Sequence, residues 1–438
     1  MATIGSYAQQ LSLMNRLNMN YAAANKNMEH IATGNKINSP ADDASGYSIG
    51  KRMDIEANSL EQCMANVQNG KSMMNVADGA MSNTLDILTT LKEKAIAAAN
   101  STANDKDRAA IQQEINQYID QIDDNSLVTF NGMYLLTGSA SAATKETNQA
   151  FTNKSLAEDV TGATKLTDLT DRVGNTLNIS ENDTIHVSYV RDGKTYHTSY
   201  SAADTTLADI FKNANKAGGG EVFDTSSMDT ATNFIGVDEN GKELYTVDDK
   251  NAITIKAAQA GKNGGLAGFT ISVTDSDGNE RKAINSVLDA FSETIGAADN
   301  TGDGSLAIHT GTSANQNIKL SLKDMSAIGL GLKGRDGSFL SVGTRENAEA
   351  AINVIQNAID KILAQQTTTG AINSRMDYTY KNLTTQNENV VSAMTTLISA
   401  DIAKEITQFT TNNMLAQATQ AMLAQSYQNS SWFLNLLG

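Results

Sequence analysis

The sequence predicts a mostly α-helical protein in which both ends of the chain join in one long antiparallel helical bundle, or coiled coil, around an inserted α+β domain. Near both ends, apolar residues recur at steps of three, four or seven over long runs, which is the seam of helices that pack side by side. Between these runs Thr, Asp, Gly, Ser and Asn dominate, and alternating strand patterns replace the helical spacing. A single proline and only 5 % aromatic residues also favour long helices of small side chains.

Composition and charge argue against several functions. The 438 residues are enough for two or three domains. A net charge of −16 argues against binding nucleic acid through a basic surface. The single cysteine, Cys63, excludes an internal disulfide or a thiolate metal cluster, and its helical setting favours a small packing residue. We expect neither a cleaved signal peptide nor a membrane partner, because no apolar run approaches the roughly 20 residues that span a bilayer.

The first amphipathic segment covers residues 7–31. Its apolar positions alternate steps of three and four, which predicts a helix with one apolar face. These positions are Tyr7, Leu11, Met14, Leu17, Tyr21, Ala24, Met28 and Ile31. The helix should end at Thr33-Gly34-Asn35, because glycine tolerates the left-handed conformation that commonly follows a helix.

The second segment, residues 41–100, is the longest seam and is broken only by isolated glycines. Its apolar positions are Ile49, Met53, Leu60, Met64, Val67, Met74, Met81, Leu85, Leu88 and Leu91. Ser39 is the expected N-cap, and Pro40 suits the first helical turn. Asp42 and Asp43 lie where carboxylates interact favourably with the positive end of the helix dipole.

A third helix should begin near Asn104 and Asp105. One of its faces carries apolar side chains at helical spacing: Ile111, Ile115, Tyr118 and Ile122. We expect it to stop at Asn131-Gly132, a dipeptide typical of turns.

The middle of the chain changes character beyond Gly138. Residues 184–190 and 195–200 alternate around a turn at residues 191–194, which predicts a β-hairpin, and residues 207–216 predict a helix. The order recurs in weaker form as a strand at residues 269–273, a turn at 275–278 and a helix at about 281–291.

Helical spacing resumes at Thr344, the expected N-cap of the next helix. A seam of four isoleucines follows, namely Ile352, Ile355, Ile359 and Ile362. We expect a Thr-rich break at residues 367–370. The seam then continues through Met376, Tyr380, Leu383, Val390, Met394 and Leu397, and from there through Ile398, Ile402, Ile406 and Phe409 to the end of the chain.

Several segments near the two ends contain sequence motifs that are specific to one protein family. Residues 37–46 (INSPADDASG) resemble the INSAxDDAAG signature of bacterial flagellins, and residues 130–138 (FNGMYLLTG) resemble their FNGxxLLxG segment. Residues 308–332 are similar to the family's return strands, and residues 370–375 (GAINSR) to its LGAxxNR segment. Repeated MLAQ wording near the end resembles the flagellin tail. The matching positions that we take as an assembly signature are Asn38, Asp42, Asp43, Gly46, Asn131, Gly132 and Arg375.

This resemblance implies an extracellular filament subunit that polymerises with itself, for swimming motility. By the same resemblance, the flagellar type III apparatus exports it with an export chaperone, and it assembles under the filament cap beyond the hook-associated proteins. Residues 1–40 and 395–438 would be the terminal helices that line the filament core, disordered in the monomer. Residues 41–180 and 306–394 would form the spoke domain, with a β-hairpin region, and residues 181–305 a variable α+β outer domain.

A further implication concerns host recognition. Flagellins that Toll-like receptor 5 detects present a Gln-Arg pair followed by Arg-Glu-Leu on the spoke helix. The aligned positions here are Thr89, Thr90, Lys92, Glu93 and Lys94, with Glu114 on the next helix. Arginine and a buried leucine often dominate interfaces, and neither residue type is present at these positions. We therefore expect weak engagement of the receptor.

The sequence offers little for catalysis or cofactors, and we expect neither. The four histidines form no metal-binding motif, and the HExxH helix of the zinc peptidase that some flagellins carry is absent. His186 and His197 could face each other across the predicted hairpin, although a surface pair is the favoured interpretation over a metal site. Asp275 to Gly278 faintly resembles a calcium loop but fits turn chemistry better.

Two alternative functions stay open at this point. A hook-filament junction protein shares the helical pattern of both ends, whereas the DDASG and FNG wording and the tail favour flagellin. An enzyme housed in the middle domain is the alternative of another class.

Overall fold

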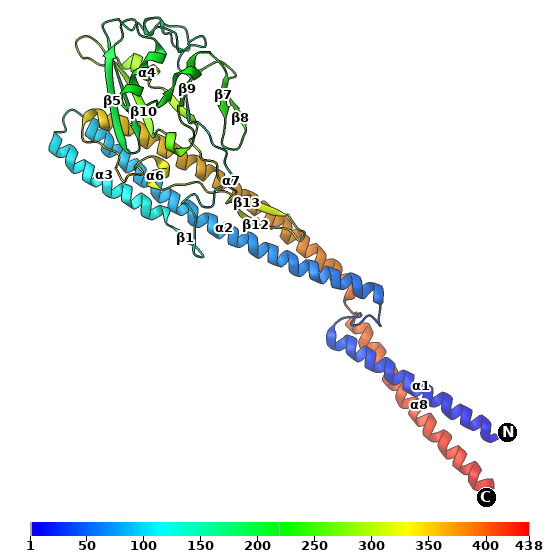
Figure 1. Ribbon diagram of the computed structural model, residues 1–438. Helices are drawn as coiled ribbons and strands as arrows, with labels where there is room; N and C mark the ends of the chain where they lie inside the picture. The colour runs from blue at the N-terminus through cyan, green and yellow to red at the C-terminus, as the bar shows by residue number, and fades with distance from the viewer. Residues whose placement is uncertain (1, 219, 438) are drawn as a thin grey trace. The chain divides into compact units, whose positions relative to one another are not determined.

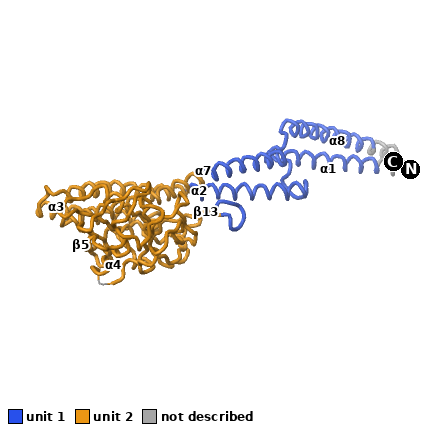
Figure 2. Tube along the Cα trace, turned by 90° about the horizontal axis from the view of Figure 1, so that it is seen from above, with its two compact units in different colours: residues 1–68, 309–316, 377–438 blue, residues 69–308, 317–376 orange. Residues whose placement is uncertain are grey.

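A computed structural model describes residues 2–218 and 220–437. The chain divides into two compact units. Unit 1 comprises residues 1–68, 309–316 and 377–438, and unit 2 comprises residues 69–308 and 317–376. Figure 2 shows the units in different colours. Unit 1 is built mainly from helices, whereas unit 2 combines helices with all of the larger sheets.

Unit 1 contains a terminal helix pair, α1 (Ala2–Thr33) and α8 (Ile402–Leu437). The two helices run antiparallel and lie side by side (Figure 1). Side chains join them along their length. Gln10 donates to the Ser426 carbonyl at 3.4 Å, and Asn412 donates to Asn27 Oδ1 at 2.9 Å. The predicted first helix and its end at Gly34, which has a φ of +72°, are confirmed.

The second long helix, α2 (Ala44–Ala99), and α7 (Arg345–Ile398) each extend through parts of both units. In unit 1, Thr384 of α7 lies 3.4 Å from the Met64 sulfur of α2. In unit 2, Asn373 donates to Asn75 at 3.3 Å. Most of the predicted α2 seam is buried or partly buried, Cys63 included, but Ile49 is exposed.

Two predictions about helix breaks are wrong. No break occurs at residues 367–370, because α7 is continuous and the Thr367 and Thr368 hydroxyls donate back to the carbonyls of Leu363 and Ala364 within the helix. Conversely, the helix does break at residues 399–401, between α7 and α8, where the apolar spacing predicted none. The expected N-cap at Thr344 is confirmed, since its hydroxyl accepts from the Asn347 amide.

The third helix, α3 (Asp105–Ser126), begins at the predicted point, where Asn104 and Asp107 form a reciprocal capping box. It ends earlier than expected. Asn131-Gly132 is the turn of a small hairpin formed by β1 (Thr129–Phe130) and β2 (Met133–Tyr134), and both turn residues have positive φ. This backbone twist suits a two-residue hairpin, so the dipeptide reverses a strand and does not end the helix.

The remaining strands and helices form the β-rich part of unit 2. A three-stranded sheet has the order β10-β4-β5, a four-stranded sheet has the order β11-β3-β9-β6, and β7 pairs with β8. Their strands are β3 (Ala150–Asn153), β4 (Thr184–Arg191), β5 (Lys194–Ser201), β6 (Phe223–Asp224), β7 (Phe234–Val237), β8 (Glu243–Tyr245), β9 (Ile253–Ala257), β10 (Gly268–Thr274) and β11 (Phe291–Ile295). The helices are α4 (Leu207–Ala217) and α5 (Lys282–Leu288), with short 3₁₀ turns η1 (Leu166–Asp168), η2 (Thr225–Met228) and η3 (Lys262–Gly264).

The chain returns from this part through two short strands and a helical turn. The strands β12 (Leu306–His309) and β13 (Asn317–Leu320) form a two-stranded sheet, and α6 (Ala327–Leu330) follows. The predicted β4–β5 hairpin and the α4 helix are confirmed. The later helix, α5, is shorter than expected, because Phe291 already belongs to β11.

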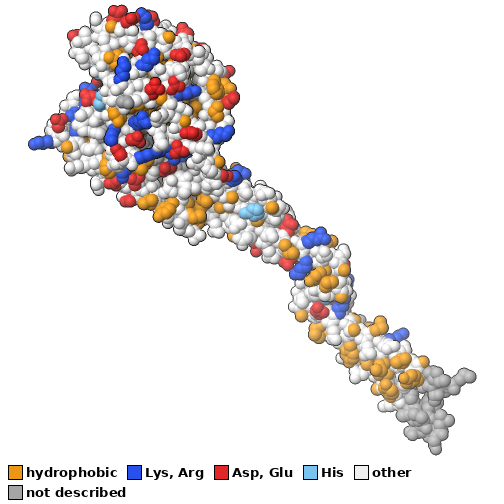
Figure 3. Space-filling model, in the orientation of Figure 1, with side chains coloured by type: hydrophobic (Ala, Val, Ile, Leu, Met, Phe, Trp, Pro, Cys, Tyr) orange, Lys and Arg blue, Asp and Glu red, His pale blue; other side chains and the backbone are white. Residues whose placement is uncertain are grey.

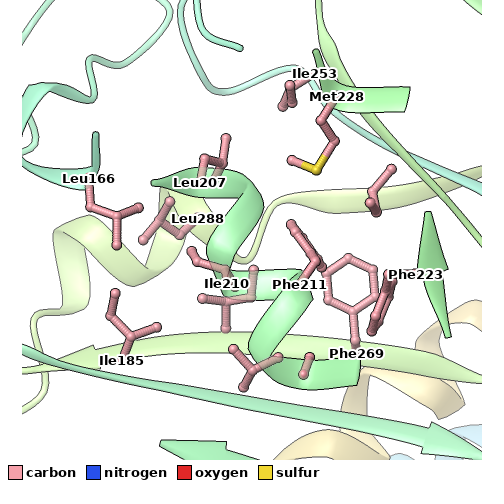
Figure 4. Packing of buried hydrophobic residues seen from close by; sticks show 14 of the residues in the cluster. Leu166, Ile185, Leu207, Ile210, Phe211, Phe223, Met228, Ile253, Phe269 and Leu288 are labelled. Atoms are coloured by element: carbon pink, nitrogen blue, oxygen red, sulfur yellow. The ribbon is translucent and has the colours of Figure 1, made fainter. Parts of the chain in front are cut away.

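The main hydrophobic core lies among these strands and α4 (Figure 4). Phe211 of α4 packs against Phe223, Phe269 and Phe291, with ring centroids 5.1 to 5.7 Å apart. Aliphatic side chains from η1, β4 and α5 close the cluster. Although aromatic residues are rare in the chain, these four phenylalanines gather in one place.

Candidate functional site

The fully buried positions between α1 and α8 carry small and polar side chains, while larger apolar residues are only partly buried there, namely Leu13, Leu17, Ile31, Phe409 and Leu423. Ala24 and Ala416 are 3 % and 0 % exposed, and Asn27 and His30 are the buried polar residues of α1. Asn27 donates to Glu405 Oε2 at 2.5 Å. Burial of small side chains removes little apolar area from water, so this seam contributes little hydrophobic stabilisation.

Many of the large apolar side chains of the terminal helix pair are instead exposed. Met19 and Met422 are 70 % and 60 % exposed. The others are Tyr7, Leu11, Met14, Tyr21 and Met28 on α1, and Ile402, Ile406, Met414, Leu415 and Tyr427 on α8. Figure 3 shows apolar side chains frequent on these helices, whereas charged side chains of both signs intermingle on the drawn face of unit 2. An exposed apolar surface of this extent is typical of a protein–protein interface.

The signature residues Asn38, Asp42, Asp43 and Gly46 lie in or beside a joint, which we define as residues 34–43 and 399–401, where both helical paths break. The two segments are bonded to each other. The Lys36 amide donates to the Ile398 carbonyl at 2.7 Å, and the Ala400 amide donates to the Gly34 carbonyl at 2.9 Å. The joint is therefore held by backbone hydrogen bonds between the two ends of the chain.

Asp42 organises the first segment of the joint. Its Oδ2 accepts from the amides of Asn38 and Ser39 at 3.1 and 3.0 Å, and its Oδ1 lies 2.9 Å from the Lys26 ammonium. Lys26 first, and then these two amides, hold the pKa of the Asp42 carboxyl well below its ordinary value.

The start of α2 differs from the prediction. The helix begins at Ala44, and Asp43 Oδ1 accepts from the Ser45 amide, so Asp43 caps it and Ser39 does not. Residues 39–42 form a turn of their own. Gly46 packs closely here, since a Cβ on it would lie 2.5 Å from Asp43 Oδ2 and 2.7 Å from Ile37 Cδ1. This close approach explains why the position suits glycine.

One buried polar contact next to the joint was not predicted. His30 Nδ1 lies 3.3 Å from Glu405 Oε1, and both side chains are largely buried. Hydrogen bonding from Asn27, followed by His30, lowers the pKa of Glu405. No sequence motif marks this group, because Asn27, His30 and Glu405 come from opposite ends of the chain.

The other signature residues lie in unit 2. Asn131 and Gly132 form the β1–β2 turn, and Arg375 is exposed on α7. Several exposed apolar side chains flank the turn, namely Leu127, Met133 and Tyr134. Four signature residues therefore lie at the joint in unit 1, and three belong to unit 2.

The positions aligned with the receptor epitope lie on α2 in unit 2. Thr89 and Glu93 are exposed, and Thr90, Lys92 and Lys94 are partly exposed. The hydroxyls of Thr89 and Thr90 donate back to the carbonyls of Leu85 and Asp86 at 3.0 and 3.1 Å. The hydroxyl hydrogens of these two threonines are therefore already used in hydrogen bonds within the helix.

The lysines at these positions have partners within the chain. Lys94 Nζ lies 2.8 Å from Glu114 Oε2 on α3, and this contact raises the pKa of Lys94. Lys92 donates to Gln356 on α7. Among the six epitope positions, the one contact between different helices is that of Lys94 on α2 with Glu114 on α3.

Metal and calcium chemistry finds no support among the described residues, in which no group of three or more His, Cys, Asp or Glu is placed to hold a metal ion. His186 is not opposite His197. It faces Ser199, whereas His197 faces Ser188 and bonds to Ser188 and Asn347, each at 2.7 Å. Asp275 accepts from the amides of its own turn, in line with turn chemistry. None of the described helices combines the length and apolarity needed to cross a membrane.

Two family models match the two ends of the chain. The model of the bacterial flagellin N-terminal helical region matches residues 4–141, and that of the bacterial flagellin C-terminal helical region matches residues 352–437. The chain belongs to the bacterial flagellin family. The predicted resemblance is thereby confirmed, and it accounts for the signature wording at both ends.

Full-length relatives agree with this assignment. A flagellin of Clostridium tyrobutyricum is 29 % identical over 419 residues, which cover 95 % of this chain and 97 % of the relative. A flagellin of Bacillus subtilis is 25 % identical over 447 residues, covering 98 % and 97 %. Among solved structures, flagellar hook-associated protein 3 of Legionella pneumophila covers 79 % of this chain and 98 % of its own, with 13 % identity and a TM-score of 0.34.

Membership of the family defines the general role of the chain. This flagellin is an extracellular subunit of the flagellar filament, a structural protein that assembles with itself and is not an enzyme. The expected mostly helical fold, with long helices from both ends and an α+β insert, is confirmed as well. The sequence motifs did not predict the exposed apolar surface of α1 and α8. The spacing of the apolar residues is visible in the sequence, but it does not show which of them stay exposed when the two helices pair.

Proposed function

We propose that this flagellin polymerises through the outward apolar side chains of its terminal helix pair. The observation that carries the proposal is the distribution of polarity in α1 and α8, where the fully buried positions are small or polar and most methionines and tyrosines, with several leucines and isoleucines, face solvent. Neighbouring subunits would cover these side chains, and the gain in buried apolar area would drive assembly.

Seeded polymerisation with two double variants tests this proposal. Met19→Gln with Met422→Gln removes apolar surface but leaves the seam between α1 and α8 intact, because both side chains point to solvent. We expect little or no filament by electron microscopy. The control, Gln9→Ser with Gln417→Ser, changes two exposed polar residues of the same helices and should polymerise like the parent chain. Normal filaments from the methionine variant would contradict the proposal.

We further propose that the terminal helices are ordered only on assembly, which suits export of an unfolded chain. In this proposal residues 1–40 and 395–438 line the filament core, residues 41–180 and 306–394 form the spoke, and residues 181–305 form the outer domain. The partners are the type III export apparatus, an export chaperone, the filament cap and the hook-associated proteins. The weak apolar content of the α1–α8 seam supports the late ordering.

We also propose that Toll-like receptor 5 binds this flagellin poorly. The position aligned with the receptor-binding arginine is Thr90, whose hydroxyl bonds to its own helix, and the position aligned with leucine is Lys94, which pairs with Glu114. Arginine and leucine provide, respectively, a planar set of five donors and an apolar anchor, which a threonine and a paired lysine do not replace.

A gain-of-function variant makes the receptor proposal testable. Thr89→Gln, Thr90→Arg and Lys94→Leu together restore three of the four differing positions and leave Lys92 unchanged. We expect binding to the receptor ectodomain to tighten by at least about 30-fold, the effect of one strong interface residue. The matched control is Thr385→Arg, an exposed threonine of α7 with the same backward hydroxyl bond. Nanomolar binding of the unmodified chain would refute the proposal.

A further inference from the structure

The two edges of the sheet β10-β4-β5 differ in how their backbone groups are satisfied. At the β10 edge, the amides of Ile271 and Val273 donate to Asp289 Oδ1 and Asn285 Oδ1 at 2.9 and 2.7 Å. The Val273 carbonyl accepts from the Arg281 amide, and the Phe269 carbonyl accepts from Asn353. Side chains and the following segment therefore cap most of the outward backbone groups of this edge.

The opposite edge, β5, is uncapped. Arg191 and Lys194 flank a two-residue turn and so form a hydrogen-bonded pair. The backbone N–H and C=O groups of Lys194, Tyr196, Thr198 and Tyr200 therefore point toward β4. Those of the residues between them, Thr195, His197 and Ser199, point away from β4. Among residues 2–218 and 220–437, no strand pairs with this edge and no hydrogen bond reaches those three amides. Figure 1 shows no strand beyond β5.

The open edge lacks the features that normally prevent strand addition. β5 has eight residues and contains no proline, and its register against β4 is regular, without a bulge. Its only charged residue is Lys194, at one end. Natural proteins usually protect an edge of this length with inward charges, prolines, bulges or a covering segment.

We propose that β5 pairs edge to edge with β5 of a second copy of this chain. The strand is self-complementary in an antiparallel register centred on Thr198. Thr198 then faces Thr198 of the second copy and Tyr196 faces Tyr200, and both kinds of cross-strand pair are favourable. The outward groups of Thr195, His197, Ser199 and Ser201 meet one another in this register.

Charge does not oppose the same occupant. Lys194 is the only charged residue of β5. In this register it lies opposite Ala202 of the second copy, so the two lysines are at opposite ends of the contact and no like charges face each other.

The symmetry of the contact separates it from polymerisation through the terminal helices. A two-fold contact closes on itself, whereas a filament grows through head-to-tail contacts between subunits that all point the same way. The β5 pair therefore links copies from different filaments. Since no residue of α1 or α8 takes part, filament formation and β5 pairing can fail independently.

Disulfide trapping in the full-length chain tests the pairing. Thr198→Cys places two thiols on directly opposed residues, at a Cα separation that permits a disulfide. We expect covalent dimers under mild oxidation. Ser272→Cys, a partly exposed position on the capped β10 strand, should stay monomeric, as should the unmodified chain, whose Cys63 is buried.

A second substitution separates pairing from folding. Ser199→Lys adds a charge at the open edge. Combined with Thr198→Cys, we expect it to abolish the cross-linking. In electron micrographs we expect unmodified filaments to associate side by side into bundles, and filaments of Ser199→Lys alone to stay separate and individually normal. Far-UV circular dichroism confirms that each variant folds. Equal cross-linking of the Thr198→Cys and Ser272→Cys variants, or equal bundling of wild-type and Ser199→Lys filaments, would overturn the proposal.

Discussion

The terminal helix pair and the β-rich part of unit 2 use the same amino acids in opposite ways. In the terminal pair most large apolar side chains face solvent, and the fully buried positions include Ala24, Asn27 and Ala416. In the β-rich part, Phe211, Phe223 and Phe269 are buried together with many aliphatic residues, and Phe291 packs against them. The contrast supports the proposal that one chain holds both a β-rich domain with its own core and a helix pair that is completed by neighbouring subunits.

The largest expected difference is in backbone protection. In the unpolymerised chain, the α1 and α8 amides should exchange with solvent orders of magnitude faster than those of β4, because isolated helices without a large apolar core are marginal. Hydrogen exchange read by mass spectrometry measures both regions in one sample. After polymerisation α1 and α8 should become protected, while β4 changes little. Equal protection of both regions before assembly would contradict the claim that the terminal helix pair is less stable than the β-rich part.

The sequence predicted the helices better than it predicted their surroundings. Apolar spacing located α1, α2 and the two parts of α7, because a helix that buries one face needs that spacing. It failed at residues 367–370, where threonines and a glycine suggested a break but packing against α2 keeps α7 helical. Local propensity is weaker than tertiary packing, so single-residue signals inside a long seam are unreliable.

The candidate site was predicted only where a family signature exists. The wording around Asp42 and Gly46 pointed to the joint, but the contact of His30 with Glu405 joins residues from opposite ends of the chain and leaves no local pattern. The β4–β5 hairpin was predicted, yet which of its strands has an open edge depends on the position of β10, far along the chain. Contacts between distant segments are what sequence reading alone could not supply.

Truncation of a core phenylalanine should affect only the β-rich part. Phe211→Ala removes a fully buried ring that contacts three others, and we expect a loss of about 3–5 kcal/mol in the free energy of unfolding. Urea denaturation followed by near-UV circular dichroism measures it. The control, Met19→Ala on α1, should change the same transition by less than about 0.5 kcal/mol. A comparable loss of unfolding free energy in the two variants would contradict the view that the β-rich part folds independently of the terminal helix pair.

The joint provides an intermediate test, because it is held by polar bonds and not by a core. Asp42→Ala removes the acceptor of the Asn38 and Ser39 amides and the partner of Lys26, so the amides of residues 38 and 39 should exchange faster. Asp54→Ala is the matched control, since the carboxylate of Asp54 pairs with Lys51 and accepts from Asn58, both on α2 itself. Unchanged exchange at residues 38 and 39 in the Asp42 variant would show that Asp42 does not organise the turn.

The smallest expected effect concerns acid stability within unit 2. Lys319, followed by Ser305, lowers the pKa of Asp303 from 3.8 to about 2. A carboxyl with a lowered folded-state pKa stabilises the fold above its unfolded pKa, and this contribution is lost as the pH falls through the folded value. For Asp303 the loss should occur between about pH 4 and pH 2.

Asp303→Asn removes that titration and should flatten, slightly, the fall of the unfolding midpoint of unit 2 between about pH 4 and pH 2, with the largest difference from the parent at pH 4 and above. The effect is small because Asp303 and Lys319 are solvent-exposed. Thermal melts at several pH values measure it, and about 1 M salt should reduce the difference by screening. If the terminal helix pair has no cooperative unfolding transition of its own, it adds no separate step to these melting curves. A pH profile that is identical in parent and variant would mean that the Asp303–Lys319 pair makes no net contribution to folding.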